Sequence, residues 1–303
     1  MAVTFPEIRI GEPLRCTGLT VFPLFADPGG GADYALSDEA IGQGSVLVEE
    51  VSEAGSVPDL SVENKGDLRV LFLEGEELIG AKQNRILNTS VLVAARAKTR
   101  IPVSCVEQGR WGYTSRAFGS SGSHSPSKLR YLMKASVTES VKARRGHRAD
   151  QGEVWEEVER QQAALGTASG TSAMSDTFVA HSARVKEMQE GLPYVEGAVG
   201  AAVAVGGKVV SCDLFDKAAT CRKVWARLLS GAVLDTLEDP VEEKQAEAAD
   251  VERVLNRLAD LSWEPAEAVG EGEEYRATSE AGDHASALLL DGALVHGSIM
   301  CAG

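Results

Sequence analysis

The chain has 303 residues with 45 acidic and 30 basic side chains, so its formal net charge is −15. Apolar residues make up 44% and charged residues 25%, the balance of a folded globular protein. This composition excludes a disordered tail, a collagen-like repeat and a disulfide-stapled miniprotein. No window approaches the roughly 18 uninterrupted apolar residues of a membrane span, and the N-terminal sequence lacks the pattern of a secretory signal. We therefore expect no membrane partner.

The cysteines indicate the redox environment. There are five, widely scattered and without a Cys-x-x-Cys pair. This pattern fits reduced thiols better than a disulfide framework or a structural zinc site. We therefore expect a cytoplasmic location.

The charge is spread unevenly along the chain. Residues 65–148 hold 16 basic and 6 acidic side chains, a local balance of +10, so the remainder carries −25. Overall acidity makes a nucleic-acid partner unexpected, whereas a basic region inside an acidic chain suits a small anionic metabolite. The alternative is that this region pairs internally with the acidic C-terminal third, where surface pairs contribute little.

Residues 1–116 are predicted to be mainly strands. The candidate segments are short, rich in β-branched or aromatic residues and bounded by turn residues. They are Leu19–Phe25, Ser45–Val51, Asp67–Leu73, Arg85–Ala95 and Thr99–Val106. A short helix is predicted to begin near Ser37, which is followed by two acidic residues suited to the positive end of a helix dipole.

Residues 125–192 are predicted to be helical. Ser125-Pro126 is a helix start signal, and Asp150 with Glu153 resembles a capping box. A third helix is predicted over Met174–Leu192, where apolar residues and His181 recur at helical spacing and Gly191 serves as the C-terminal cap.

Residues 193–303 are predicted to return to strands. Two hairpins are expected, one turning at Gly206-Gly207 and one at Asp291-Gly292, with helices over Lys223–Leu237 and Pro240–Leu261 between them. This order predicts an α+β fold in which strand-rich N- and C-terminal parts pack together. We expect a single domain over residues 1–303, with residues 125–192 as a helical insertion.

Searches for catalytic motifs are mostly negative. The sequence contains no His-Glu-x-x-His, no Gly-x-Ser-x-Gly and no dinucleotide fingerprint. The segment from Gly75 to Lys82 imitates a phosphate loop, but Ala81 precedes the lysine and two carboxylates would oppose a phosphate. No motif therefore names a cofactor or a metal, although paired carboxylates are able to hold a divalent cation.

A dense polar cluster follows the predicted strands that end near Leu73 and Val106. Charged groups at the edge of a core are costly unless they are paired or hydrogen-bonded. Arg85 and Arg110 are candidates to bind Glu74 or Glu107 as bidentate forks. If the strand continues past Leu73, Glu74 and Glu76 lie on one face. The cluster is either a structural Arg–Glu network or a binding pocket. Its members are Glu74, Glu76, Glu77, Lys82, Gln83, Asn84, Arg85, Asn88, Ser104, Cys105, Glu107, Arg110 and Trp111.

The runs at 71–88 and 101–111 resemble the ARG-and-rhodanese-phosphatase-associated domain family, and weaker matches extend over most of the chain. The family is named for its occurrence beside ADP-ribosylglycohydrolases and rhodanese or phosphatase-like proteins. The resemblance implies a setting in NAD or ADP-ribose chemistry, and it transfers no catalytic residue.

These observations predict a pocket that acts on a phosphorylated or nucleotide-derived metabolite of the NAD or ADP-ribose kind. Glu76 or Glu107 would be the general acid or base. Arg85 and Arg110 would hold the anionic part, and Trp111 would stack on a ring. The remaining substrate-binding candidates are Glu74, Gln83, Asn84 and Asn88. The alternatives are a non-catalytic ligand-binding or scaffold protein associated with ADP-ribose metabolism, and a structural homo-oligomer.

Several side chains outside these roles also have two interpretations. Cys105 is a nucleophile or, more commonly, a small buried apolar residue. His124 is expected in a flexible loop, His181 in the core, and His296 beside the last hairpin. Basic residues between Lys128 and Arg148 form one helical face, which binds an anion or is simply solvated.

Overall fold

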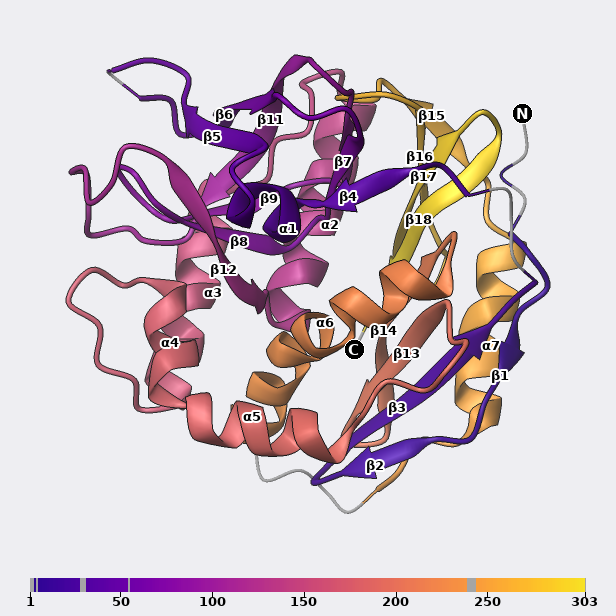
Figure 1. Ribbon diagram of the computed structural model, residues 1–303. Coiled ribbons are helices and arrows are strands. Elements are labelled where there is room, and N and C mark those ends of the chain that lie inside the picture. The colour runs from indigo at the N-terminus through magenta and orange to yellow at the C-terminus, as the bar shows by residue number, and fades with distance from the viewer. Residues whose placement is uncertain (1–2, 4, 28–30, 54, 239–243, 303) are drawn as a thin grey trace.

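The computed structural model describes the whole chain except residues 1–2, 4, 28–30, 54, 239–243 and 303, and it shows a strand-rich α+β fold (Figure 1). The largest sheet of the described residues is antiparallel and has the order β1-β3-β13-β14-β18-β17-β16-β15, with β2 also paired to β3. Its strands are β1 (Arg9–Ile10), β2 (Leu14–Cys16), β3 (Leu19–Phe25), β13 (Gly200–Val205), β14 (Lys208–Phe215), β15 (Glu264–Ala266), β16 (Glu273–Thr278), β17 (His284–Leu290) and β18 (Ala293–Met300). The sheet therefore joins strands from both ends of the chain, as predicted.

Two smaller sheets come from residues 34–124. One has the order β10-β7-β4 and the other β12-β8-β9-β11-β6-β5. Their strands are β4 (Tyr34–Leu36), β5 (Val46–Glu50), β6 (Asp59–Asn64), β7 (Arg69–Phe72), β8 (Glu76–Gly80), β9 (Arg85–Leu87), β10 (Val91–Val93), β11 (Lys98–Cys105) and β12 (Phe118–His124). The polar cluster lies on this part of the fold, around β8, β9 and the end of β11.

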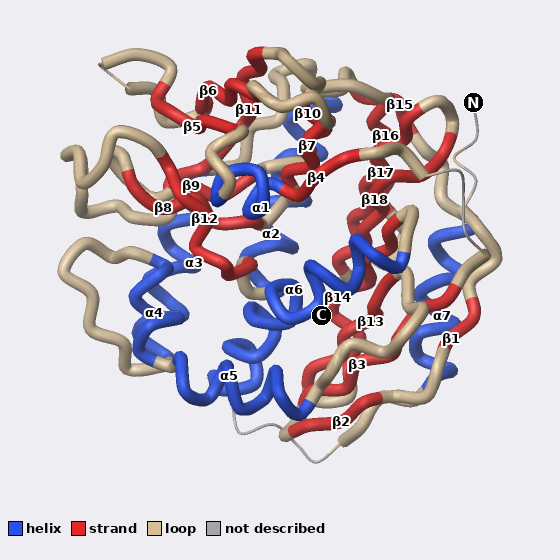
Figure 2. Tube along the Cα trace, viewed as in Figure 1, coloured by secondary structure: helices blue, strands red, loops and turns tan. Residues whose placement is uncertain are grey.

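The helices cover the sheets, and the longest run of consecutive helices lies in the middle of the chain, between residues 127 and 191 (Figure 2). They are α1 (Ser37–Gly42), α2 (Ser127–Lys142), α3 (Gln151–Ala164), α4 (Met174–Ala180), α5 (Ser182–Gly191), α6 (Ala218–Glu238) and α7 (Ala248–Ala259). Helices α6 and α7 pack on opposite faces of the largest sheet. In β3, Leu19 and Val21 belong to the core beneath α6, whereas Phe22 and Leu24 belong to the core beneath α7. Burial on both faces explains why β3 is apolar at every position except Thr20.

Both predicted hairpins are confirmed. Strands β13 and β14 pair around Gly206-Gly207, and β17 pairs with β18 around Asp291-Gly292. The turn glycines Gly206, Gly207 and Gly292 have positive φ, which glycine adopts without strain. Asp150 accepts hydrogen bonds from the amides of Gly152 and Glu153 at the start of α3, as its capping role requires.

Some predicted elements have the wrong extent. The helix expected over Met174–Leu192 breaks at His181, because α4 packs against α3 and β12 whereas α5 packs against α6. The strand expected over Arg85–Ala95 is two strands, β9 and β10, which join different sheets. The helix expected over Pro240–Leu261 begins only at Ala248, where Glu247 donates its amide to Asp250. Residues 240–243 of that prediction lie outside the described residues.

Candidate functional site

The chain turns sharply between β7 and β8, and this turn separates the predicted carboxylates. Gly75 has a φ of +81°, and a Cβ added there would lie 2.4 Å from Cε1 of His124. Strand β7 ends at Phe72 and β8 begins at Glu76. The strand therefore does not continue through Glu74, and the expected one-face arrangement of Glu74 and Glu76 is wrong.

Glu74 lies in a buried network of charges between α2 and the largest sheet. Its Oε1 accepts a hydrogen bond from Ser298 at 2.6 Å and is 2.6 Å from Nζ of Lys134. Burial alone would raise the pKa of Glu74, but the charges of Lys134 and Arg130 outweigh it and hold that pKa well below its usual range. Lys134 also donates to Ser286 and Ser298, so its three donors are all used.

The same network extends to Asp213 and His296. Arg130 donates two hydrogen bonds to Asp213, and a ring nitrogen of His296 lies 3.3 Å from the same carboxylate. The other ring nitrogen of His296 is 2.9 Å from Oγ of Ser90. The adjacent cavity, lined in part by Glu74, Asn88, Arg130 and Lys134, measures about 10 Å³, room for about one water. This part of the molecule resembles a structural charge network more than a binding pocket.

Glu76 faces helices rather than the other predicted site residues. It accepts a hydrogen bond from Ser37 at 2.6 Å, and Nη2 of Arg227 on α6 lies 2.8 Å away. Burial is the largest influence and raises the pKa of Glu76 despite Arg227. Asn88 donates to the carbonyl of His147 and accepts from Ser104. Neither side chain is among those lining the open cavity described below.

Glu107 and Arg110 form the bidentate fork that the sequence suggested. Nε and Nη2 of Arg110 donate to the two oxygens of Glu107 at 2.7 and 2.6 Å. Glu107 also accepts from the amide of Asn84 and from the hydroxyl of Thr171. Burial opposes ionisation, but these donors lower the pKa of Glu107. With four donors the carboxylate is well suited to positioning Asn84 and poorly suited to exchanging protons.

Arg85, Gln83 and Trp111 lie next to this fork. Arg85 on β9 is fully buried, and its Nη1 donates to the backbone and side-chain oxygens of Gln83. Its Nη2 lies 3.7 Å from Oε1 of Glu50 on β5. The ring of Trp111, half of which is exposed, lies over the guanidinium with its centroid 5.9 Å from Cζ.

An open cavity of about 740 Å³ lies between β8, β12 and α4. Five serines, Asn84 and the apolar side chains of Ile79, Phe178 and Val179 contribute to its lining. Asn84 is held firmly, because it accepts from the amide of Gly80 and from Arg110, and donates to Ser175. The residues that line this cavity are Glu77, Ile79, Gly80, Asn84, Thr114, Ser115, Ala117, Gly119, Ser121, Ser123, Ser175, Phe178, Val179 and Ser182.

Glu77 is the acidic group at the floor of this cavity. It is 1% exposed and has no cationic partner among the described residues; the Ser121 hydroxyl and the Ser175 amide lie beside its carboxylate without a hydrogen bond of ordinary geometry. Burial raises its pKa to about 8; nearby Ser121 lowers it in part, and the charges of Glu107 and Asp176 raise it further. A carboxyl with a pKa near neutrality beside an open cavity is suited to proton transfer. Glu77 belongs to the polar cluster of the sequence, but its role could not be predicted there because its surroundings include α4 residues such as Ser175 and Asp176.

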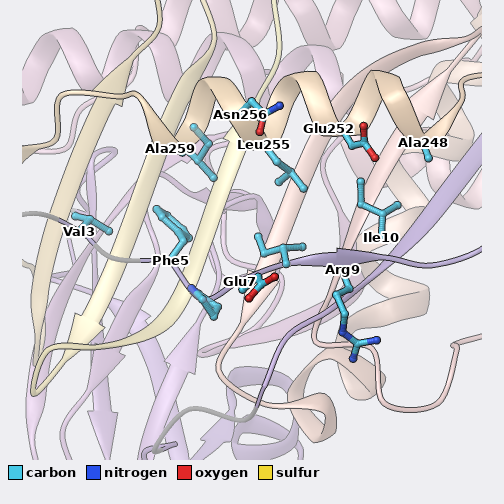
Figure 3. A pocket seen from close by; sticks show the side chains of 13 residues that line it. Val3, Phe5, Glu7, Arg9, Ile10, Ala248, Glu252, Leu255, Asn256 and Ala259 are labelled. Atoms are coloured by element: carbon cyan, nitrogen blue, oxygen red, sulfur yellow. The ribbon is translucent and has the colours of Figure 1, made fainter.

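Other predicted residues and cavities have different surroundings. The expectation of a loop at His124 is wrong: it ends β12, is 1% exposed, and pairs in register with Glu76. Cys105 is buried, and burial raises the pKa of its thiol. A groove of about 890 Å³ between the N-terminal segment and α7 (Figure 3) is lined by Phe5, Ile10 and Leu255 among others, and contains none of the predicted site residues.

The first half of the basic helical face is used internally, whereas Lys142, Arg144, Arg145 and Arg148 are exposed. Arg130 and Lys134 are buried in the charge network, and Lys128 pairs with Glu238. Among the described residues, no group of three or more His, Cys, Asp or Glu side chains is placed to hold a metal ion. In the described part of the chain, no helix is both long and apolar enough to cross a membrane.

The fold is thus α+β, and its six-stranded sheet carries an open pocket whose largely apolar lining also presents five serines and Asn84. The model of the ARG and Rhodanese-Phosphatase-superfamily-associated Protein domain matches residues 7–300, so the chain belongs to that family. The association in the family's description suggests a metabolic role. No curated protein and no solved structure matches the chain.

Proposed function

We propose that the cavity between β8, β12 and α4 binds the hydroxylated part of a small nucleotide-derived metabolite, such as an ADP-ribose-type compound, and that Glu77 exchanges a proton with it. The observation that carries this proposal is the buried Glu77, which has no cationic partner among the described residues and lines an open cavity with five serines. Ser121, which lies beside Glu77, would relay the proton to the bound molecule.

The charges of the cavity limit which part of the metabolite enters. Its lining contains no Lys, Arg or His side chain, so an anionic group is not expected inside. Arg110 is already engaged by Glu107, and Arg85 is buried behind Trp111. We therefore assign the hydroxyl groups to Asn84 and the serines, and leave a phosphate outside the cavity. Glu107 and Arg110 become positioning residues for Asn84.

Thermal-shift measurements with adenosine, ADP-ribose, ribose and inorganic phosphate test the binding, and mass spectrometry of the same mixtures tests turnover. We expect stabilisation by the ribose-containing compounds, weakened in Asn84→Ala. Product formation should be lost in Glu77→Gln and kept in Glu190→Gln, a matched change on the exposed face of α5. Binding without turnover in every variant would favour the non-catalytic alternative, and no stabilisation by any compound would contradict the proposal.

Three further proposals concern the location, the domain organisation and the oligomeric state of the chain. We propose a cytoplasmic location, which agrees with the five free cysteines of the structure. We propose that residues 1–303 form one domain with a helical insertion over 125–192. The alternative to a binding pocket is a structural protein that forms a homo-oligomer, and light scattering of the purified chain measures its oligomeric state directly.

A further inference from the structure

Arg85 and Glu50 form an ion pair whose hydrogen-bonding atoms are mostly unused. The side chains are 0% and 3% exposed, and Nη2 lies 3.7 Å from Oε1. Nε and Nη2 of Arg85 and both carboxylate oxygens of Glu50 have no hydrogen-bond partner among the described residues. Nε and Nη2 form the edge of the guanidinium that binds two acceptors in its plane. Donors and acceptors thus lie side by side without partners.

The buried Arg227–Glu76 pair also has unused atoms, but its charged atoms are 2.8 Å apart, whereas those of Arg85 and Glu50 are 3.7 Å apart. Buried polar groups in native proteins are nearly always hydrogen-bonded, so four unused atoms at one place require an explanation. The fork between Arg110 and Glu107, whose charges also act on Arg85, shows what a satisfied pair in this protein looks like. A ligand with complementary atoms would satisfy the Arg85–Glu50 pair in the same way.

Aromatic side chains lie at the solvent side of the pair. Trp111 and Tyr113 are 52% and 54% exposed, and each ring centroid lies 5.1 Å from Nζ of Lys82. The amides of Gly112 and Thr114 donate to the carbonyls of Lys82 and Ala81, which fixes the backbone of this segment. We expect access to Arg85 to require rotation of the Trp111 side chain, which lies over the guanidinium.

We propose that Arg85 and Glu50 recognise a planar ring that carries a carbonyl oxygen next to an N–H group, and that Trp111 stacks on this ring. The guanidinium edge donates to the carbonyl, and the carboxylate accepts from the N–H. A lactam of the kind found in hypoxanthine and guanine has this pattern. Because Glu50 would repel an anion, the pair selects this uncharged edge over a phosphate. The inference rests on the proposed function and narrows its metabolite: because adenine has no carbonyl next to an N–H, the ring would be of the hypoxanthine or guanine kind rather than the adenine of ADP-ribose.

The test uses three ligands with the same sugar, measured by calorimetry on the full chain. Inosine carries the lactam, 1-methylinosine lacks its N–H, and purine riboside lacks both the carbonyl and the N–H. We expect inosine to bind at least about tenfold more tightly than the other two, as for one charge-assisted pair of hydrogen bonds. In Glu50→Gln, which weakens the acceptor, the preference should fall to about threefold or less. Trp111→Ala should weaken all three ligands and remove the tryptophan fluorescence change on binding.

The outcomes separate this inference from the proposed function. Equal affinities of the three ligands for the unmodified chain would overturn the ring assignment, while Glu77-dependent turnover of a ribose compound would leave the cavity proposal standing. A preference for inosine that persists unchanged in Glu50→Gln, in a variant with an unaltered melting temperature, would also overturn it. Absence of binding by all three would overturn the ring assignment as well.

Discussion

Arg130 on α2 and Asp213 on β14 face each other through two parallel hydrogen bonds, Nη2 to Oδ1 at 2.7 Å and Nη1 to Oδ2 at 3.0 Å. The two side chains are 5% and 0% exposed. This fork ties the first helix of the helical segment to the centre of the largest sheet. It lies within 4 Å of the Glu74 carboxylate, which connects the sheet to the β7–β8 turn.

Removing one partner of this fork should destabilise the fold strongly. Arg130→Met leaves Asp213 charged and buried, so we expect a loss of roughly 3–5 kcal/mol in the free energy of unfolding. Replacing both residues by apolar ones should recover much of that loss. Urea unfolding measures both effects, with Arg144→Ala, an exposed residue nearby, expected within about 0.5 kcal/mol of the unmodified chain. A single variant as stable as the unmodified chain would show that the fork does not hold α2 to the sheet.

The Glu77 carboxyl should make the fold less stable as pH rises. Its pKa is raised to about 8, so between about pH 4.5 and 8 the folded protein holds a proton that the unfolded chain has released. Stability then falls with rising pH, by about 1.4 kcal/mol for each unit in this window. Glu77→Gln removes this contribution, and its advantage over the unmodified chain should grow by at least about 2 kcal/mol from pH 4.5 to pH 8.

Asp235, whose pKa burial raises to about 7, provides the control because it acts in the same direction at another place. Asp235→Asn should remove the contribution of Asp235 to the pH dependence of stability, which ends near pH 7. Glu77→Gln should keep the Asp235 contribution and lose that of Glu77, which extends to about pH 8. A stability difference between Glu77→Gln and the unmodified chain that stays constant with pH would disprove the raised pKa.

Two glycine-to-alanine changes should have opposite effects although both lie in helices. A Cβ at Gly231 on α6 would lie 2.2 Å from the carbonyl oxygen of Ser125, so the helix or the β12–α2 junction must shift. We expect a loss of roughly 2 kcal/mol or more from this overpacking. At Gly42 on α1 nothing lies within 4 Å of the added Cβ, and alanine should be neutral or stabilising by up to about 1 kcal/mol. Thermal unfolding of the two variants measures both effects, and equal changes in melting temperature would contradict the close approach at Gly231.

Glu107→Gln should loosen the segments that it holds together. The change leaves Arg110, which is 16% exposed, without its counter-charge and weakens the bond to Asn84. We expect a loss of roughly 2–4 kcal/mol and faster amide exchange over residues 80–84 and 108–116. Glu49→Gln is the matched control, because its partner Arg116 is 94% exposed and the pair should contribute less than about 1 kcal/mol. Unchanged exchange in Glu107→Gln would argue against its positioning role.

Local patterns located much of the fold and part of the site. The hairpins, the cap at Asp150 and the apolar residues of α2, α4 and α5 depend on neighbours close in sequence, and these were predictable. The fork between Arg110 and Glu107 was also foreseen, since its members are three residues apart. Glu74 was expected near an arginine, but its partners Lys134 and Ser298 are 60 and 224 residues away, and no local pattern pairs residues at such separations.

The sequence by itself determined the α+β class, the globular composition, the turn positions and the family, because these follow from composition, periodicity and contiguous motifs. Only the tertiary structure decided which carboxylate faces a cavity. Glu76 and Glu77 are adjacent and chemically alike, but successive residues of β8 point to opposite faces of the sheet. One face is covered by α6 with Arg227, which pairs with Glu76. The other meets α4 and the serines, where Glu77 has no charged partner among the described residues and its pKa is raised.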